Sequence, residues 1–195
     1  MFRRVLIANR GEIALRILRS LRSMGIDAVV IHGKEDRLSL PVRLADEGVY
    51  IPRSDPLASY LDIEAIVEAA KEVGADAVHP GYGFLAENPV FAQRLEDEGI
   101  TFIGPSPEVL RLLGDKIAAR DAMTKAGIPV ARGSDGPISN PKEAAKQAAE
   151  IGYPVIIKAA AGGGGIGMQV VDSPDDFDKA LRLYQGRALS AFDDD

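Results

Sequence analysis

The sequence predicts an α/β protein in which a doubly wound parallel sheet is followed by a small α+β unit. Up to residue 103, short apolar runs alternate with segments of helical periodicity, and most of these segments end at a glycine. A stretch rich in Pro, Gly, Ser and Asp over residues 128–140 separates this alternation from a region with two short strands and a glycine cluster. Repeated βα units favour an open parallel sheet, which binds ligands at the carboxyl ends of its strands.

Five strands are expected in the first unit. Each is a short, mainly apolar run, and turn residues or a polar segment lie between it and the next element. The predicted strands are Arg4–Ala8, Asp27–His32, Gly48–Ile51, Asp76–His79 and Ile100–Ile103. The last two flank a helical segment, as the first two do, so all five fit βα crossovers within one parallel sheet.

Helices are expected between these strands, because apolar residues recur there every three to four positions. The first has Ile17 and Leu21 on one face and stops at Gly25. Asn88 is expected to cap a later helix, with Pro89 at its first position. The predicted helices are Glu12–Met24, Leu61–Val73, Pro89–Glu98 and Pro107–Gly114. The polar segment 33–47 carries no prediction.

The second region is expected to read helix, strand, loop, strand, helix. A helix over Asp115–Ala126 precedes the boundary stretch, and Asn140 begins the next helix, which ends at Gly152. The strands end at Lys158 and begin at Met168, and the last helix starts at residue 174. We therefore expect a first domain over residues 1–114, a linker helix and loop over 115–135, and a subdomain over 136–195.

Composition excludes several classes of protein. The chain has 195 residues, of which 46% are hydrophobic and 27% charged, as in ordinary globular proteins. It has no cysteine, so thiolate metal sites are excluded, and its two histidines are too far apart in sequence to suggest a metal motif. The net charge of −6 argues against a nucleic-acid surface, and no apolar run is long enough to span a membrane. We expect a cytoplasmic protein with neither nucleic acid nor membrane as a partner.

The stretch from Tyr153 to Val171 carries an apolar strand, a lysine, a glycine cluster and a second strand. A dinucleotide loop would need a helix directly after the glycines, and a P-loop would need Gly-Lys-Ser or Gly-Lys-Thr at its end. A strand follows instead, so a glycine flap over phosphates between antiparallel strands fits better. The alternative is a hairpin loop without a ligand. Because each ordered glycine costs roughly 0.5–1 kcal/mol, a purely structural hairpin would rarely contain so many.

A second candidate site follows the fourth strand, in the sequence HPGYGFLAEN from His79 to Asn88. Glycines on either side of Tyr82 suggest close approach of a ligand, although the tyrosine could simply pack. Arg10 and Glu12, in the loop after the first strand, could likewise have a structural role as a local ion pair. Lys116 at a helix start could be a solvated surface charge, whereas Lys158 at the end of an apolar strand favours a functional role.

The strings IANRGEIALR (residues 7–16) and HPGYGFLAEN together resemble the N-terminal part of biotin carboxylases. These ligases are the ATP-grasp component of acetyl-CoA, propionyl-CoA and pyruvate carboxylases. The resemblance therefore includes enzymes of fatty acid biosynthesis. Further matching text includes FIGP at residues 102–105, GDK at 114–116, GSDG at 133–136 and GYPVIIK at 152–158. The resemblance implies a pre-ATP-grasp, Rossmann-like first domain followed by an ATP-grasp lid subdomain over 136–195.

The resemblance also implies a reaction and its site residues. ATP with Mg²⁺ or Mn²⁺ and bicarbonate would carboxylate biotin held on a carrier protein. The residues implied to contact ATP are Lys116, Lys158, Gly163, Gly164, Gly165, Gly167 and Met168. The residues implied on the biotin and bicarbonate side are Tyr82, Gly83, Phe84 and Glu87. The implied partners are the biotin carboxyl carrier protein or domain, a carboxyltransferase and, in the full-length enzyme, a second copy in a homodimer.

The resemblance places the metal ligands and the catalytic residues beyond residue 195, in a C-terminal ATP-grasp domain absent from this sequence. We therefore expect this chain alone not to turn over and to bind MgATP weakly. Two alternatives remain. One is another ATP-grasp ligase, for example of carbamoyl phosphate synthesis, which would not be expected to carry HPGYGFLAEN. The other is a non-enzymatic module that docks onto a full-length carboxylase.

Overall fold

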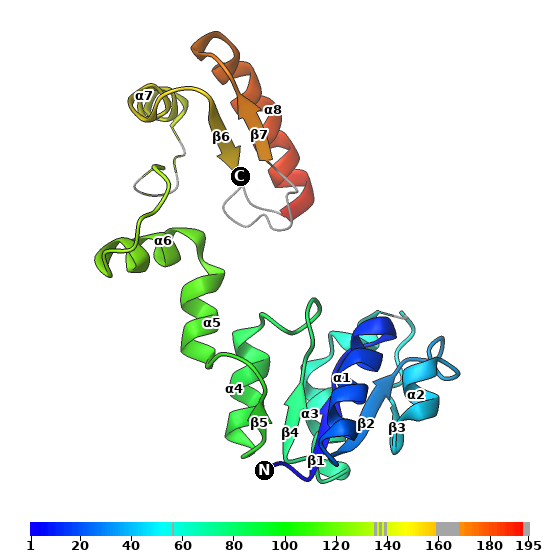
Figure 1. The fold of residues 1–195 in the computed structure, drawn as a ribbon. Helices are drawn as coiled ribbons and strands as arrows, with labels where there is room; N and C mark the ends of the chain where they lie inside the picture. The colour runs from blue at the N-terminus through cyan, green and yellow to red at the C-terminus, as the bar shows by residue number, and fades with distance from the viewer. Residues whose placement is uncertain (56, 135, 137, 139, 159–167, 193–195) are drawn as a thin grey trace. The chain divides into compact units, whose positions relative to one another are not determined.

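The predicted parallel sheet forms the centre of the first of two units. The computed structural model describes residues 1–55, 57–134, 136, 138, 140–158 and 168–192, with side chains described as far as residue 183. The chain divides into Met1–Gly114 and Asp115–Asp195, and each unit is described by itself. Figure 1 shows the elements of both units along the chain.

The five strands of the first unit are all parallel and lie in the order β3-β2-β1-β4-β5. Their bounds are β1 Arg4–Ile7, β2 Asp27–His32, β3 Glu47–Tyr50, β4 Ala77–His79 and β5 Thr101–Phe102. All five predicted strands are present, each within one residue of its expected ends. The central strand β1 is buried on both sides, as its continuous apolar run predicts.

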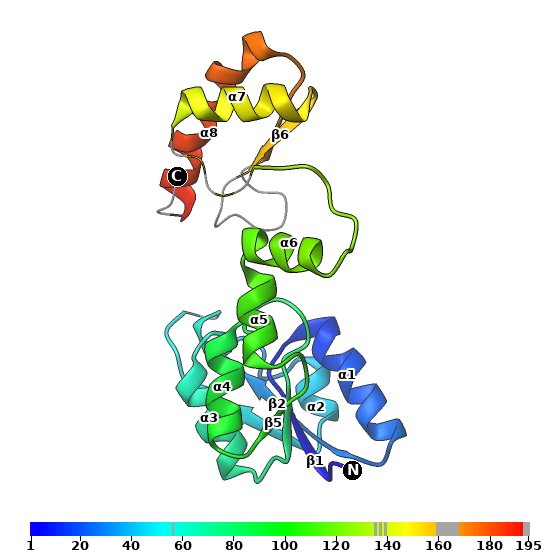
Figure 2. The same cartoon turned by 90° about the vertical axis from the view of Figure 1, so that its left-hand side faces the viewer.

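Helices cover both faces of this sheet, which confirms the doubly wound fold class (Figure 2). The helices are α1 Gly11–Ser23, α2 Leu40–Leu44, α3 Ile63–Glu72, α4 Pro89–Asp97 and α5 Pro107–Gly114, with a short 3-10 helix, η1, at Ala58–Tyr60. Alternate side chains of β1 enter two separate cores. Val5 and Ile7 pack with α1, whereas Leu6 packs with α3 and α4. The period of two along the strand thus divides the apolar residues between the two faces.

The segment 33–47, for which the sequence made no prediction, contains α2 and the first residue of β3. This helix has only five residues, and Pro41 is the second of them. Val42 and Leu44 pack on the core beneath α1. Two apolar contacts within one short turn produce no repeating pattern, so the helix depends on tertiary packing rather than on local periodicity.

The second unit is an antiparallel hairpin that packs against helices on one face. Its elements are α6 Lys116–Lys125, α7 Pro141–Ile151, β6 Val155–Lys158, β7 Met168–Val171 and α8 Pro174–Phe192. Val171 lies in a small core with Phe177 and Leu181 of α8. The other face of the hairpin is exposed, since Ile156 and Val170 are 54% and 50% accessible.

The cap of α4 gives a first test of this fold. Asn88 Oδ1 accepts hydrogen bonds from the backbone N–H groups of Val90 and Phe91 at 2.9 and 3.0 Å, as the Asn-Pro signal predicts. We expect Asn88→Ala to lower the free energy of unfolding by about 1 kcal/mol, because two N–H groups lose their partner. Urea denaturation measures this loss. Asn88→Asp, which keeps an acceptor, is the control, and equal losses in both variants would contradict the capping role.

Candidate functional site

The candidate site begins with two loops at the carboxyl edge of the sheet. β1 and β4 are neighbours, with Ile7 opposite His79. In the strand order β3-β2-β1-β4-β5, successive connections run outward on opposite sides of this pair. This is the topological switch point, where open α/β sheets leave a crevice for ligands. The loop after β1 contains Asn9, and the loop after β4 follows His79 in the HPGYGFLAEN string.

Asn9 joins these two loops through its side chain. Its Nδ2 donates to the carbonyl oxygens of Pro80 at 2.7 Å and Tyr82 at 3.0 Å. Its Oδ1 accepts from the backbone N–H of Arg10 at 2.8 Å. The side chain is completely buried, so these bonds replace the water that the amide has lost. The backbone on both sides of Gly81 is therefore held against the start of α1.

Gly81 is required at this junction for two physical reasons. Its φ is +69°, a conformation that glycine adopts without steric cost. A Cβ on this residue would lie 2.6 Å from Ile13 Cγ2 and 2.8 Å from Asn9 Nδ2. The close approach of the two loops thus depends on the absence of a side chain here.

Phe84 has a φ of +45° and is the residue other than glycine with a positive φ in the described part of the chain. Such a backbone costs of order 1–3 kcal/mol and persists where surrounding contacts hold it. The phenyl ring is half-buried, and its centroid lies 5.2 Å from that of Tyr60. Strain of this kind, in a loop at the switch point, is typical of a ligand site.

Tyr82 points outward from the same loop. It is 63% exposed, and its hydroxyl donates a hydrogen bond to the carboxylate of Glu12. That bond raises the pKa of the Tyr82 hydroxyl above its ordinary value. The exposed ring does not fit the alternative in which Tyr82 packs into the core. Glu87, near the end of the loop, is also exposed.

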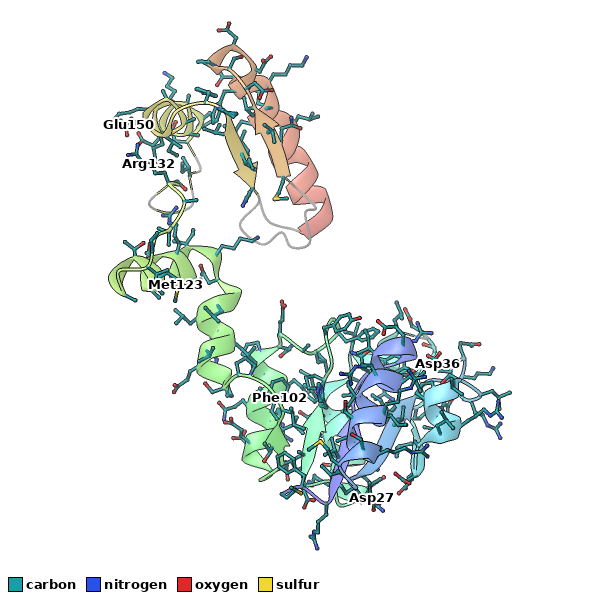
Figure 3. All side chains as sticks on the ribbon, in the orientation of Figure 1. Asp27, Asp36, Phe102, Met123, Arg132 and Glu150 are labelled. Carbon is teal, nitrogen blue, oxygen red and sulfur yellow. The ribbon has the colours of Figure 1, made fainter. Side chains whose placement is uncertain are left out.

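Arg10 does not form the local ion pair with Glu12 that was considered from the sequence. Its guanidinium instead binds Asp36 in a bidentate pair, Nε to Oδ2 at 2.7 Å and an Nη to Oδ1 at 2.8 Å. Asp36 also accepts from the Tyr60 hydroxyl at 2.7 Å. The Arg10 guanidinium holds the pKa of the Asp36 carboxyl below its usual range. Figure 3 shows Asp36 near the carboxyl ends of the strands and Asp27 near their amino ends.

Sequence reasoning missed Asp36 and Tyr60. Asp36 lies in the polar segment after β2, and Tyr60 lies in η1, where no apolar period marks a helix. The signal that could have found Asp36 is its position just beyond a strand's carboxyl end, where polar residues gather around ligands. Tyr60 has no comparable signal, because its role depends on contacts with residues more than twenty positions away.

The second candidate site lies on the hairpin of the second unit. Lys158 and Met168 face each other at the ends of β6 and β7, and both are exposed. They share the exposed face with Ile156 and Val170, because side chains alternate along each strand. Lys116 is the first residue of α6, whose cap is Asp115, and it is also exposed. The predicted flap glycines Gly163, Gly164, Gly165 and Gly167 lie outside the described residues.

The described residues form neither a metal cluster nor a membrane-spanning helix. No group of three or more His, Cys, Asp or Glu side chains lies together in a way that could hold a metal ion. Within the same part of the chain, no helix combines the length and the apolar character needed to cross a membrane. The structure thus assigns no metal ligand to any residue that it describes.

Two family models together match nearly the whole chain. Residues 1–110 match the biotin carboxylase N-terminal domain. Residues 115–195 match the carbamoyl-phosphate synthase L chain ATP-binding domain. The second model is named for a different ligase, so this match does not by itself assign the chain to biotin carboxylases. The first match makes that assignment.

Similar proteins are named as biotin carboxylases and pyruvate carboxylase subunits. The chain is 53% identical to the biotin carboxylase of Pseudomonas aeruginosa over 98% of its residues, which cover 43% of that protein. It is 50% identical to a pyruvate carboxylase subunit of Methanothermobacter thermautotrophicus over its full length and 40% of that protein. The chain thus spans less than half the length of these relatives.

The chain is also similar in fold to solved structures of biotin carboxylases. Biotin carboxylase from Campylobacter jejuni, solved as a β-γ-ATP complex, has a TM-score of 0.93 and 46% identity, over 100% of this chain and 44% of that one. The biotin carboxylase domain dimer of 2-oxoglutarate carboxylase from Hydrogenobacter thermophilus was solved with MgADP, ADP and bicarbonate. It has a TM-score of 0.92 and 45% identity, over 100% of this chain and 43% of that one.

The likeness to solved biotin carboxylase structures over the whole chain places the protein in the ATP-grasp class. Within that class the chain belongs to the biotin carboxylase family, through the N-terminal domain that spans residues 1–110. This confirms the predicted family and fold. The roles of individual residues in the two candidate sites stay predictions.

The junction of the two loops can be tested at Gly81. We expect Gly81→Ala to destabilise the protein more than Gly74→Ala, as measured by urea unfolding. Gly74 has a similar φ of +62°, but an added Cβ there meets nothing within 4 Å. Gly74→Ala should therefore cost about 1–2 kcal/mol from backbone strain alone. Gly81→Ala should cost about 1–3 kcal/mol more, because it overpacks the contact with Asn9. Equal losses would contradict the close approach.

His79 makes the loop sensitive to acid. Its Nδ1 accepts a hydrogen bond from the Gly81 N–H at 3.0 Å, and burial lowers its pKa from the ordinary value of 6.5. The unfolded chain therefore takes up a proton at a higher pH than the folded chain. Stability from the neutral ring is present above pH 6.5 and declines as the pH falls toward the folded pKa.

We expect the free energy of unfolding to fall more for the wild type than for His79→Gln between about pH 7.5 and about pH 5. Denaturant titrations at a series of pH values measure the two slopes. Parallel curves would show that His79 titrates alike in the folded and unfolded chains.

Proposed function

We propose that this chain supplies the biotin-side loop and the ATP lid of a biotin carboxylase. The reaction is the carboxylation of biotin on a carrier protein, with ATP and bicarbonate as co-substrates. One observation carries the proposal. Asn9 of the IANRGEIALR string is hydrogen-bonded to the HPGYGFLAEN loop, far away in sequence, at the switch point of the sheet, where such folds bind ligands.

The loop after β4 is suited to a small planar ligand such as a ureido ring. Tyr82 offers an exposed aromatic face, and Glu12 restrains its hydroxyl. Gly83 leaves the adjacent backbone open, since a Cβ there would meet nothing within 4 Å. Phe84 and Glu87 complete the biotin side. Holding the ring at a fixed angle lowers the entropic cost of reaction, which is the contribution that positioning residues make.

The second unit is suited to the phosphates of ATP. Lys158 ends an apolar strand with its amine exposed, and Lys116 begins α6. Positive charge aimed at a transferring phosphoryl group stabilises it electrostatically without a covalent step. Met168 adds an apolar contact beside Lys158 for the nucleotide base. The glycines Gly163, Gly164, Gly165 and Gly167 would supply backbone N–H groups from the connecting segment.

Mg²⁺ or Mn²⁺ would neutralise charge on the ATP phosphates when bound. The described residues bring no metal-binding cluster together, so they do not fit a metal site of their own. The described residues therefore act on ATP by their own charges and not through a metal. The residues that do contribute here are the lysines, which reduce the same negative charge by direct contact.

We further propose a biotin carboxyl carrier protein or domain, and a carboxyltransferase, as partners, and the cytoplasm as the location. The pairing of two copies is supported by the Hydrogenobacter thermophilus neighbour, which is a biotin carboxylase domain dimer. The link to a carboxyltransferase is supported by the pyruvate carboxylase relatives. Which acyl-CoA or keto acid is finally carboxylated depends on that second enzyme.

A chimera tests the proposed function. Residues 1–195 replace the matching 43% of the Pseudomonas aeruginosa biotin carboxylase, to which the chain is 53% identical. We expect ATP hydrolysis that requires both bicarbonate and biotin. Lys158→Ala should lower kcat/KM for ATP about 10–100-fold, since a hydrogen bond to a charged group is worth about 1.5–3 kcal/mol.

The control in the same chimera is Lys146→Ala. Lys146 lies on α7 with a 68% exposed side chain, 4.0 Å from Glu150. Removing it changes the net charge by the same amount and should leave kcat/KM for ATP unchanged. Equal losses in the two variants would argue against a phosphate contact for Lys158. Hydrolysis that ignores biotin in a folded chimera would argue against the proposed reaction.

A further inference from the structure

We propose that Tyr60, held by Asp36 and Arg10, is a positioning residue for the biotin-side loop. It supports the strained Phe84 and so fixes the direction of Tyr82. The part of this inference that concerns biotin rests on the proposed function, whereas the part that concerns the loop does not.

Tyr60 is held by the burial of its ring and by two hydrogen bonds at its hydroxyl. Its ring is completely buried, and its hydroxyl donates to Asp36 Oδ2 at 2.7 Å. The same hydroxyl oxygen accepts from the backbone N–H of Gly33 at 3.2 Å. Burial and the Asp36 carboxylate both raise the pKa of this hydroxyl, so it remains a donor. The ring therefore has one orientation relative to the loop after β2.

Asp36 is the centre of the network, because three donors converge on its carboxylate. Two come from Arg10 and one from Tyr60. Its side chain is only 15% exposed. The Arg10 guanidinium also lies 5.8 Å from the centroid of the Tyr60 ring, within the range of a cation–π contact. Arg10 directly follows Asn9, which holds the backbone of Pro80 and Tyr82.

Phe84 connects this network to the loop. Its ring centroid lies 5.2 Å from that of Tyr60, with planes tilted by 30°. Because its backbone has an unfavourable φ of +45°, a contact on the ring decides whether the loop keeps this conformation. Tyr82 lies two residues before Phe84, so a change in the strained residue redirects the exposed tyrosine.

The chemistry of the network points to orientation rather than stability. A phenylalanine at position 60 would fill the same buried volume without burying a hydroxyl. Partly buried ion pairs often add little net stability, because the loss of hydration offsets the attraction. Their better-supported role is to select one geometry among several. Here the selected geometry lies directly beneath the candidate biotin loop.

Two variants of the 195-residue chain test the inference. Tyr60→Phe keeps the ring against Phe84 and removes the hydroxyl. Asp36→Asn keeps the shape of the side chain and removes its charge. If Asp36→Asn does not fold, Tyr60→Phe decides the result alone. The matched control is Arg94→Gln, which breaks an exposed bidentate pair with Glu64 on α3 and α4.

The first measurement is aromatic ¹H–¹³C NMR of the chain with ring-¹³C phenylalanine, in which the added ring of Tyr60→Phe is recognised by its absence from the wild-type spectrum. Phe84→Leu assigns the Phe84 signal. Phe91 is an internal reference, because its buried ring packs on Phe102 with centroids 6.0 Å apart. We expect the Phe84 signal to shift or broaden in both test variants, while Phe91 stays unchanged. A purely stabilising role would leave both signals in place, and this result would overturn the inference.

The second measurement is amide hydrogen exchange within the loop. The N–H of Ala86 bonds to Gly83 O at 2.9 Å, and the N–H of Asn88 bonds to Leu85 O at 3.1 Å. We expect both to exchange about tenfold faster in the test variants than in wild type or Arg94→Gln. Amides of β1 and β2 should be unaffected. Equal acceleration throughout the first unit would mean general destabilisation and would overturn the positioning role.

Saturation-transfer NMR with free biotin separates the two proposals. If the wild-type chain gives a biotin signal, Tyr60→Phe should reduce it several-fold, and an unchanged signal would overturn the positioning role. If the wild type gives no signal, the result counts against the biotin site under these conditions. The aromatic NMR and exchange measurements then decide the positioning role without biotin.

Discussion

The buried side-chain amide of Asn9 is the interaction on which the rest of the first site depends. It bonds to two carbonyl groups of the loop after β4 from a position just beyond the end of β1. Since β1 and β4 are neighbours at the switch point, one short side chain can span the distance between them. The absence of a side chain on Gly81 makes this approach possible. Core packing and the conformation of both loops therefore depend on one amide.

The charged groups around this amide are arranged in two layers. Beneath the loop, Arg10 and Asp36 form a partly buried pair that holds the Tyr60 hydroxyl. At the surface, Glu12 accepts from the exposed Tyr82. Arg10 and Glu12 are two positions apart at the start of α1, so their side chains diverge instead of facing each other. This divergence lets one short segment support the loop from below and restrain it from outside.

In the second unit, the alternation of side chains along two strands separates the core residues from the candidate ligand residues. Alternation along β6 and β7 sends Val155, Ile157 and Val171 toward the helices, and it leaves Lys158 and Met168 on the other face. An amine and a thioether side by side on an exposed hairpin suit a nucleotide, which has both charged and apolar parts. The chain covers 43% of the Pseudomonas aeruginosa biotin carboxylase and 44% of the Campylobacter jejuni one.

The sequence by itself determined the family, the alternation of strands and helices and the main helix limits. Apolar runs, glycine stops and the Asn-Pro signals at Asn88 and Asn140 act over a few residues, so they can be recognised locally. It also placed Tyr82 in a candidate ligand loop, because the flanking glycines are local signals. Only the tertiary structure decided that Arg10 pairs with Asp36 and that Tyr60 supports Phe84. Those partners are 24 or more residues apart, and the sheet brings them together through strand pairing that no local pattern encodes.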